Sequence, residues 1–297
     1  MKRSIDKSVL PLLMAALAFA ACDDSTGVGT TTSLTVLLTD APSDYIDEAM
    51  VDIGAVELLG GASGPVMLTE EGTDGLVNLL DLRNAATTAL AELDIEAGTY
   101  TQLRLIVQDA NVSLAPGYEF NDGSTSAELT VPSGAQTGIK LNLRAASEDG
   151  TEGGVEIAPG EMVLVVDFDV DRSFVLQGNP ETAAGINSVS FRPTLRVIVR
   201  DVAGSVSGTV STSLVGASVQ GLMVTATPVE DTVLEPFQSS TASAVTDAEG
   251  NYTIHFLVPG EYDVTVATDD AVSPETINVL VRESEEITGI DFEVVAG

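Results

Sequence analysis

The sequence predicts an all-β protein that consists of two β-sandwich domains, the first of which contains one short helix. Three observations support this fold class. Short segments with alternating apolar and polar residues, or with runs of β-branched residues, recur between Gly, Pro, Asn and Asp. A length of 297 residues is enough for about two domains. The hydrophobic fraction of 44% is close to that of globular proteins and argues against disorder.

The first 21 residues have the pattern of a secretory signal peptide. A positively charged region with Lys2, Arg3 and Lys7 precedes an apolar run over 9–21. This run is too short to span a bilayer, which needs about 20 residues. The run ends in Leu-Ala-Phe-Ala-Ala-Cys at 17–22, which resembles a bacterial lipobox, although Phe19 replaces the usual aliphatic residue. The resemblance implies that Cys22 carries a lipid and becomes the first residue of the mature protein.

Two features of the sequence favour lipidation of Cys22. It is the only cysteine of the chain, so it has no disulfide partner there, and residues 22–32 form a polar tether. The alternative is a small residue beside an ordinary signal-peptidase site. Lipidation predicts an exported protein with a stable lipid anchor in the bacterial cell envelope, on its periplasmic face or on the cell surface.

The first domain is predicted to span residues 33–203. An Ala- and Leu-rich stretch over 82–93 predicts the short helix. The strand candidates are 34–39, 50–59, 100–109, 127–131, 138–144, 161–169 and 189–200.

The second domain is predicted to span residues 204–297 as a small β-sandwich of seven strands. Within it, Asp-Ala-Glu-Gly-Asn at 247–251 is typical of a tight hairpin turn, in which Gly250 suits a positive φ. The strand candidates are about 205–212, 221–228, 239–246, 251–257, 261–267, 276–281 and 287–295.

One turn pattern recurs before predicted strands, with a glycine near its start. It occurs at 97–100 (Ala-Gly-Thr-Tyr), 159–162 (Pro-Gly-Glu-Met) and 259–262 (Pro-Gly-Glu-Tyr). The spacing between the copies is irregular, so the pattern indicates shared turn chemistry and not a repeat array.

The second domain resembles a carboxypeptidase regulatory-like domain, which is related in shape to transthyretin. The resemblance rests on the pairing of Thr-Asp-Ala-Glu-Gly-Asn-Tyr at 246–252 with Pro-Gly-Glu-Tyr at 259–262, together with 204–210 and 221–226. It implies a non-catalytic sandwich that serves as a spacer or a binding module.

Residues 33–201 resemble a bacterial family known as domain of unknown function 4382. The residues that carry the resemblance are Leu-Thr-Asp-Ala-Pro at 38–42, Val-Asn-Leu-Leu-Asp-Leu at 77–82, 97–105, 132–134, 138–142, 166–169 and 191–193. The resemblance implies a surface lipoprotein of mostly β structure, and it supplies neither an activity nor functional residues.

The charge of the chain excludes several classes of function. Twelve Lys and Arg against 45 Asp and Glu give a net charge of −33, which repels nucleic acid. One His and one Cys leave little room for catalytic triads or for metal clusters. The sequence predicts no cofactor, with calcium as the one alternative.

Three alternating carboxylates are the candidate metal ligands. Asp167, Asp169 and Asp171 would share one face of a strand, where their oxygens could bind Ca²⁺. The loop does not fit an EF-hand, because Arg172 stands where Gly is required and Gly178 where Glu is required. The alternative is a solvated or salt-bridged strand face.

Cations in the neighbouring strands offer partners for these carboxylates. Lys140, Asn142 and Arg144 are predicted on one face of their strand, and Arg196 and Arg200 on one face of another. Pairing across strands with Asp167 or Asp169 would contribute roughly 0.2–1 kcal/mol per pair. The alternative is a polar groove for an anion or a glycan.

The remaining residues predict that the protein is not an enzyme. Asp40 with Asp44 is an acid pair in principle, but Thr-Asp-Ala-Pro at 39–42 is better explained as the end of a strand, and His255 as a structural strand residue. We therefore expect a non-enzymatic binding or structural protein of the envelope, which could bind a protein partner by strand addition. The alternative is a surface protein that binds a divalent cation or a glycan.

Overall fold

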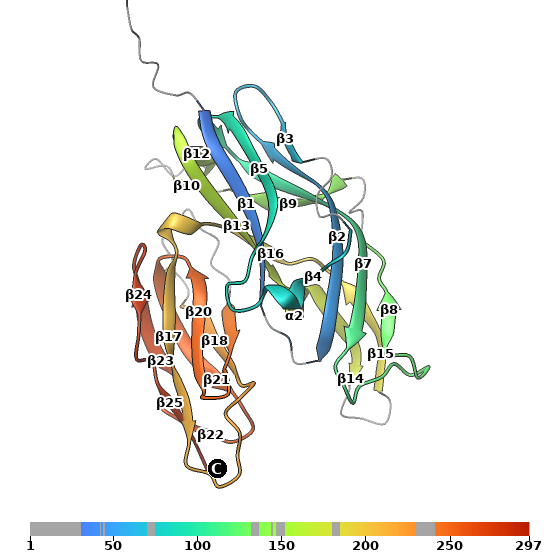
Figure 1. Ribbon diagram of the computed structural model, residues 1–297, viewed down its shortest axis with the longest axis vertical. Coiled ribbons are helices and arrows are strands. Elements are labelled where there is room, and N and C mark those ends of the chain that lie inside the picture. The colour runs from blue at the N-terminus through green and yellow to red at the C-terminus, as the bar shows by residue number, and fades with distance from the viewer. Residues whose placement is uncertain are drawn as a thin grey trace, which may run out of the picture.

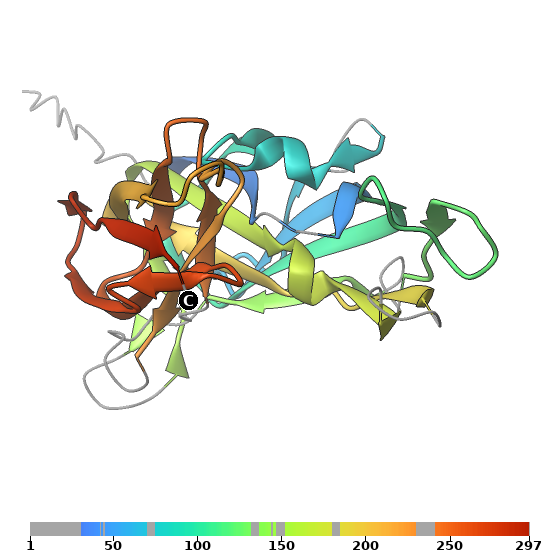
Figure 2. The same cartoon turned by 90° about the horizontal axis from the view of Figure 1, so that it is seen from below.

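The computed structural model describes residues 31–41, 43, 45–69, 75–131, 137–143, 145–146, 152–179, 185–229 and 241–296. Strands dominate these residues, which confirms the predicted all-β class. The first domain, blue to yellow, and the second, orange to red, lie side by side (Figures 1 and 2). The predicted signal peptide 1–21, Cys22, Asp44 and Arg144 lie outside the described residues. None of the helices in the described ranges has the length and apolar character needed to cross a membrane.

One sheet of the first domain has four strands in the order β16-β13-β1-β5. β1 runs parallel to β13 and antiparallel to β5, while β13 and β16 are antiparallel. The outer strands of this sheet are therefore β16 and β5. The bounds are β1 (Thr31–Ala41), β5 (Thr88–Glu96), β13 (Gly160–Asp169) and β16 (Leu195–Val199).

The facing sheet is built on a long antiparallel pair of strands, β2 and β7. β3 and β4 pair with β2, and β8 and β9 pair with β7. The bounds are β2 (Ile46–Leu59), β3 (Val66–Thr69), β4 (Val77–Asn78), β7 (Gln102–Leu114), β8 (Ser126–Glu128) and β9 (Ile139–Asn142). Three small sheets complete the domain: β6 (Gly98–Tyr100) with β12 (Val155–Ile157), β10 (Ala145–Ala146) with β11 (Glu152–Gly153), and β14 (Phe174–Asn179) with β15 (Gly185–Phe191).

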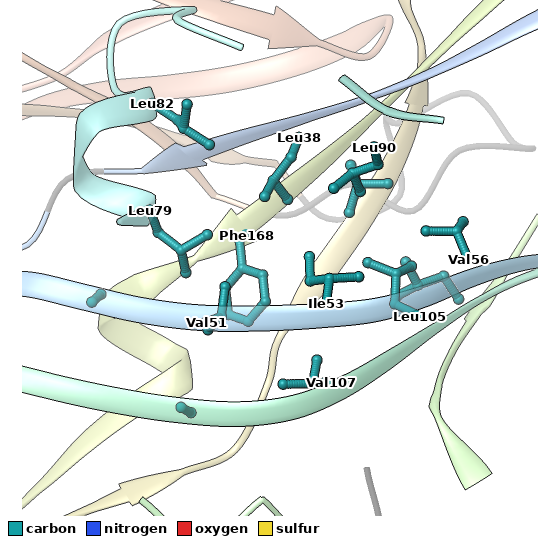
Figure 3. Close-up of a cluster of buried hydrophobic side chains, with 14 of the residues drawn as sticks. Leu38, Val51, Ile53, Val56, Leu79, Leu82, Leu90, Leu105, Val107 and Phe168 are labelled. Carbon is teal, nitrogen blue, oxygen red and sulfur yellow. The ribbon is translucent and has the colours of Figure 1, made fainter. Parts of the chain in front are cut away.

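The core of the first domain lies between its two main sheets (Figure 3). Alternate residues of each strand point inward, as the period of two requires. Leu38, Ile53, Leu105 and Phe168 come from four different strands and are fully buried. The predicted strands at 34–39, 50–59 and 161–169 therefore lie within β1, β2 and β13, with their apolar faces against each other.

The predicted helix over 82–93 is wrong. A short 3₁₀ helix, η1 (Leu79–Leu82), comes earlier, and its N-terminal Leu80 N–H donates to Asn78. Residues 88–96 form β5, which pairs with β1 and buries Leu90 and Ile95. The backbone bonds to β1 and the buried face outweigh the helical preference of Ala and Leu, which is worth less than about 1 kcal/mol per residue.

The predicted strand over 189–200 is two strands. β15 ends at Phe191 and β16 begins at Leu195, with Pro193 between them. Proline has no N–H for a strand ladder, so it marks the point where the chain leaves one sheet for the other.

The second domain is a sandwich of two sheets, as predicted. Their orders are β20-β17-β25-β22, with β24 also paired to β17, and β19-β18-β21-β23. The bounds are β17 (Gly204–Thr212), β18 (Met223–Pro228), β19 (Ala242–Val245), β20 (Asn251–Leu257), β21 (Gly260–Ala267), β22 (Ala271–Ser273), β23 (Ile277–Val281), β24 (Glu286–Ile287) and β25 (Phe292–Val295).

The turn at 247–251 has the predicted form. Gly250 has a φ of 84°, and the Asp247 carboxylate accepts hydrogen bonds from the backbone N–H groups of Glu249 and Asn251. The Asn251 side chain also donates to this carboxylate, and these bonds lower the pKa of Asp247. The carboxylate thus accepts the hydrogen bonds of the backbone N–H groups in this turn, which is a structural role.

Two of the three recurring turns close in the same way in different domains. The Tyr262 hydroxyl donates to the Val258 carbonyl, and the Tyr100 hydroxyl to the Glu96 carbonyl, each over 2.8 Å. Both tyrosines are buried, so each hydroxyl finds its partner four residues back along the chain. The recurrence reflects one corner motif, similar to the tyrosine corner of other sandwiches.

The second domain packs against the outer face of β13 and β16 in the four-stranded sheet. Val165 of β13 and Ile198 of β16 are fully buried in the apolar cluster of the second domain. Arg172 Nη2 also donates to Thr241 Oγ1 over 3.1 Å. The two domains therefore form one packed unit, with β13 and β16 in both cores.

Candidate functional site

Asp167 and Arg196, both of the first domain, form an ion pair that is buried where the two domains meet. They are register partners on β13 and β16, and Arg196 Nε donates to Asp167 Oδ2 over 2.7 Å. Arg196 Nη2 lies 2.5 Å from the same oxygen. The predicted pairing across strands is confirmed. Of the two forms expected for this strand face, solvated or salt-bridged, the structure has the salt-bridged one, and the second domain leaves Arg196 only 5% exposed and Asp167 only 8%.

Of the other two predicted calcium ligands, Asp169 is the last residue on this strand face and Asp171 lies beyond the strand. The strand ends at Asp169, whose carboxylate caps the helix α2 (Val170–Ser173) by accepting from Arg172 N–H over 3.0 Å. Asp171 lies within α2. Burial raises the pKa of Asp169, and its bond from Arg172 N–H opposes that rise. The expectation that all three carboxylates share a strand face is thus wrong. Across the ranges that the structure describes, no three Asp, Glu, His or Cys side chains are grouped to hold a metal.

A small polar cavity lies at the seam between the domains. Asp40, Asp167 and Arg196 line it from the first domain, and Thr253 and His255 from the second. Its volume of about 20 Å³ is enough for one water molecule but not for a substrate. These residues are far apart in the sequence, and only the docking of the two domains brings them together.

Unusual backbone conformations gather at this seam. Asn84, Ala85 and Phe256 have φ values of 56°, 62° and 57°, and all three line the cavity. Non-glycine residues with such φ values cost of order 1–3 kcal/mol each and persist only where the surroundings enforce them.

A larger groove opens on another side of the first domain, between the edge strands β9 and β16. Its volume is about 380 Å³, which lies within the range of ligand sites. Leu141 and Leu164 are buried in its wall, and Lys140 and Asn142 are exposed along it. The predicted alternation of β9 is confirmed over 139–143, since Leu141 and Leu143 point into the core.

The charge in the groove is opposite to that of the chain. Among the described residues, its lining contains Lys140 and Arg196 and neither Asp nor Glu, although the sequence has 45 acidic residues. Arg196 is neutralised by Asp167. Lys140 makes no ion pair with any described residue, whereas Arg104, directly opposite it on β7, pairs with Glu57. Lys140 is therefore the free cation of the groove within the described part of the chain.

Together these features define a two-domain all-β protein with a buried polar seam and an open groove. The chain belongs to the family described as domain of unknown function (DUF4382), which matches residues 31–183. The carboxypeptidase regulatory-like domain matches residues 205–295. This is the order of families that the sequence resembles.

Solved structures resemble the chain only weakly. The Bacillus anthracis TIE protein is 12% identical with a TM-score of 0.22, and the match covers 89% of this chain and 34% of that one, so the chain spans about a third of its length. GBS52, the minor pilin of Streptococcus agalactiae, is 9% identical with a TM-score of 0.23 and coverages of 89% and 98%. BcpA, the major pilin subunit of Bacillus cereus, is 11% identical with a TM-score of 0.24 and coverages of 89% and 99%. No curated protein matches the chain.

Proposed function

We propose that this protein is a lipid-anchored binding module of the bacterial cell envelope, which holds a partner without transforming it chemically. The groove between β9 and β16 is its binding surface. The observation that carries the proposal is this groove of about 380 Å³, with an apolar wall and a cationic rim. Such a combination buries part of a partner and orients it through a few polar groups.

The amino-terminal sequence supports the lipid anchor. Cys22 follows an apolar export signal and is the only cysteine of the chain. Eight residues separate it from Thr31, the first residue of β1. At full extension this segment spans about 30 Å, so a lipid on Cys22 would hold the first domain close to the membrane surface.

The groups that line the groove support binding without catalysis. His255, the single histidine of the sequence, lies elsewhere, at the cavity of about 20 Å³ and at a more open pocket of about 230 Å³. The groove, in contrast, is lined by aliphatic side chains, Lys140, Asn142, Thr194 and the ion-paired Arg196. These groups suit binding better than bond cleavage.

The anchor is tested by export of the full chain in a bacterium, comparing wild type with Cys22→Ala. We expect the wild type in the membrane fraction, with a mature N-terminal peptide that begins at a diacylglyceryl-modified Cys22. Cys22→Ala should be released from the membrane. A wild-type protein with an unmodified Cys22, or a variant that stays in the membrane, would refute the anchor.

The binding surface is tested in the same cells with a photo-crosslinking amino acid at position 140. A matched control carries it at position 282, which is exposed on the second domain. We expect an adduct of defined mass at position 140 and none at position 282. Equal adducts at both positions, or none at either, would argue against the groove as the binding surface.

A further inference from the structure

We infer that the partner enters this groove as an extended segment, which adds to β16 as a further strand and alternates apolar with acidic residues. The inference rests on the proposed binding function of the groove. It adds the form of the partner and its chemistry. Three features carry it: the free backbone of β16, the direction of its side chains, and the charge of the groove.

The first feature is the backbone of β16. Asp169 N–H donates to the Thr194 carbonyl over 3.0 Å, and bonded pairs alternate along an antiparallel ladder. By this alternation Arg196 and Ile198 bond to β13, whereas the N–H and C=O groups of Val197 point to the other edge. No described strand pairs with that edge.

The backbone of β9 follows the same logic on the opposite wall. Leu143 N–H donates to the Thr101 carbonyl over 2.8 Å, so Leu141 and Ile139 bond to β7 by alternation. The N–H and C=O groups of Lys140 and Asn142 then face the groove. β9 and β16 approach within 8 Å between Cα atoms in places, which is less than the roughly 9.5 Å that a strand between them would need. An incoming strand therefore pairs with the free groups of one edge only, as in strand addition.

The second feature is the direction of the side chains on β16. Leu195, Val197 and Val199 pack against the first-domain core and line the groove. Residues of an added strand that lie opposite them would point to the same face of the sheet, over the core. These residues must be apolar, because a polar group there would lose its hydration without gaining a partner. Since β16 has five residues, the matching segment spans about 17 Å.

The third feature is the charge of the groove. Lys140 lies on its rim without an ion pair to a described residue, and no Asp or Glu of the described ranges lines the groove. Elsewhere the chain is strongly acidic, with a net charge of −33. A basic segment would be drawn to the rest of the surface, so the groove selects for an acidic one.

The inference is tested with a fluorescein-labelled heptapeptide of alternating Val and Glu, added to the intact protein. Anisotropy is the readout at about 0.15 M salt, where the field of the acidic surface is screened beyond about 8 Å. The matched peptide replaces Glu by Lys. We expect the Val-Glu peptide to bind at least about tenfold more tightly than the Val-Lys peptide. Equal affinities, or no binding of the Val-Glu peptide, would overturn the inference while leaving the lipid anchor and the crosslink at position 140 untouched.

Two protein variants separate the backbone from the charge. Val197→Pro removes the N–H that faces the groove, so binding of the peptide should be lost. By the alternation above, this substitution breaks no hydrogen bond to β13. Lys140→Glu should weaken the Val-Glu peptide roughly fivefold or more, while Arg282→Glu, with the same change of charge on the second domain, should not. Unchanged binding in both groove variants would overturn the inference.

Hydrogen exchange keeps the inference testable if Val197→Pro does not fold. In the wild type, the peptide should slow exchange of the Val197 amide and leave the Ile198 amide unchanged. The Val197 amide could instead become protected without peptide when the protein concentration is raised, in a dimer that Lys140→Glu dissociates. In that case the occupant of the groove is a second copy of the chain and the inference is wrong.

Discussion

Arg196 and Asp167 face each other across two adjacent strands of the first domain, and the second domain buries the pair. A buried ion pair is weak evidence for net stability, but removing one partner leaves an uncompensated charge. The cost of losing one partner therefore depends on the burial that the second domain provides. Without that cover, both side chains would lie on an ordinary solvated sheet.

Replacing Arg196 alone should destabilise the protein strongly. We expect Arg196→Met to lower the free energy of unfolding by about 3–5 kcal/mol, since Asp167 would stay buried without its cation. The double variant Arg196→Met with Asp167→Leu should recover much of the loss. Urea unfolding of the single and double variants gives the coupling energy.

A surface pair provides the control. The Arg282 side chain is 68% exposed and that of its partner Glu285 is 34% exposed, so Arg282→Met should cost no more than about 1 kcal/mol. If Arg196→Met costs as little as Arg282→Met, the seam is open to water and the packed arrangement of the domains is wrong.

Ile198 should couple the unfolding of the two domains. Its side chain is fully buried in the apolar cluster of the second domain while its strand belongs to the first. The wild type should unfold in one calorimetric transition, and Ile198→Asp should separate it into two. As a control, Leu280→Asp on the exposed edge strand β23 should leave one transition. Two transitions already in the wild type would contradict the coupling.

The two tyrosine corners should contribute equally. Tyr100→Phe and Tyr262→Phe each leave a carbonyl without its donor, and we expect each to cost about 1 kcal/mol in urea unfolding. Both rings stay in place, so the change isolates the hydroxyl. A loss below about 0.3 kcal/mol for both variants would show that these hydrogen bonds do not stabilise the turns.

His255 should make the seam sensitive to acid. Burial lowers the pKa of His255, and Glu286 opposes the shift. The unfolded chain therefore binds the proton first, and the stability that neutral His255 contributes is present above about pH 6.5 and is lost as the pH falls below that value. Between about pH 7.5 and pH 5.5, the melting temperature of the wild type should fall further than that of His255→Gln. An identical loss in both proteins would refute this role.

The strands were predictable from the sequence wherever local pattern and burial agree. In β1, β2 and β13 the alternation of apolar residues matches the buried face, so residue type alone identifies the element. The prediction failed for 82–93, where Ala and Leu favour a helix but pairing with β1 decides the outcome. Helical preference is a local property, and strand pairing over more than fifty residues is not.

The sites were predictable only in part. The opposite charges of Asp167 and Arg196 on two strands suggested their pairing, which the register confirms. Their burial was not predictable, because it depends on how the second domain docks. The groove between β9 and β16 was missed for a similar reason: it arises from two strand edges that are far apart in sequence, and no residue type marks an unpaired edge.

Hydrogen exchange along β16 in the free protein, resolved by amide, tests the open edge most directly. The account predicts alternation: the amides of Arg196 and Ile198 are protected by β13, and those of Leu195, Val197 and Val199 exchange at least about tenfold faster. Uniform protection of all five amides would show that the edge is already paired, and the groove would then have no free strand to offer a partner.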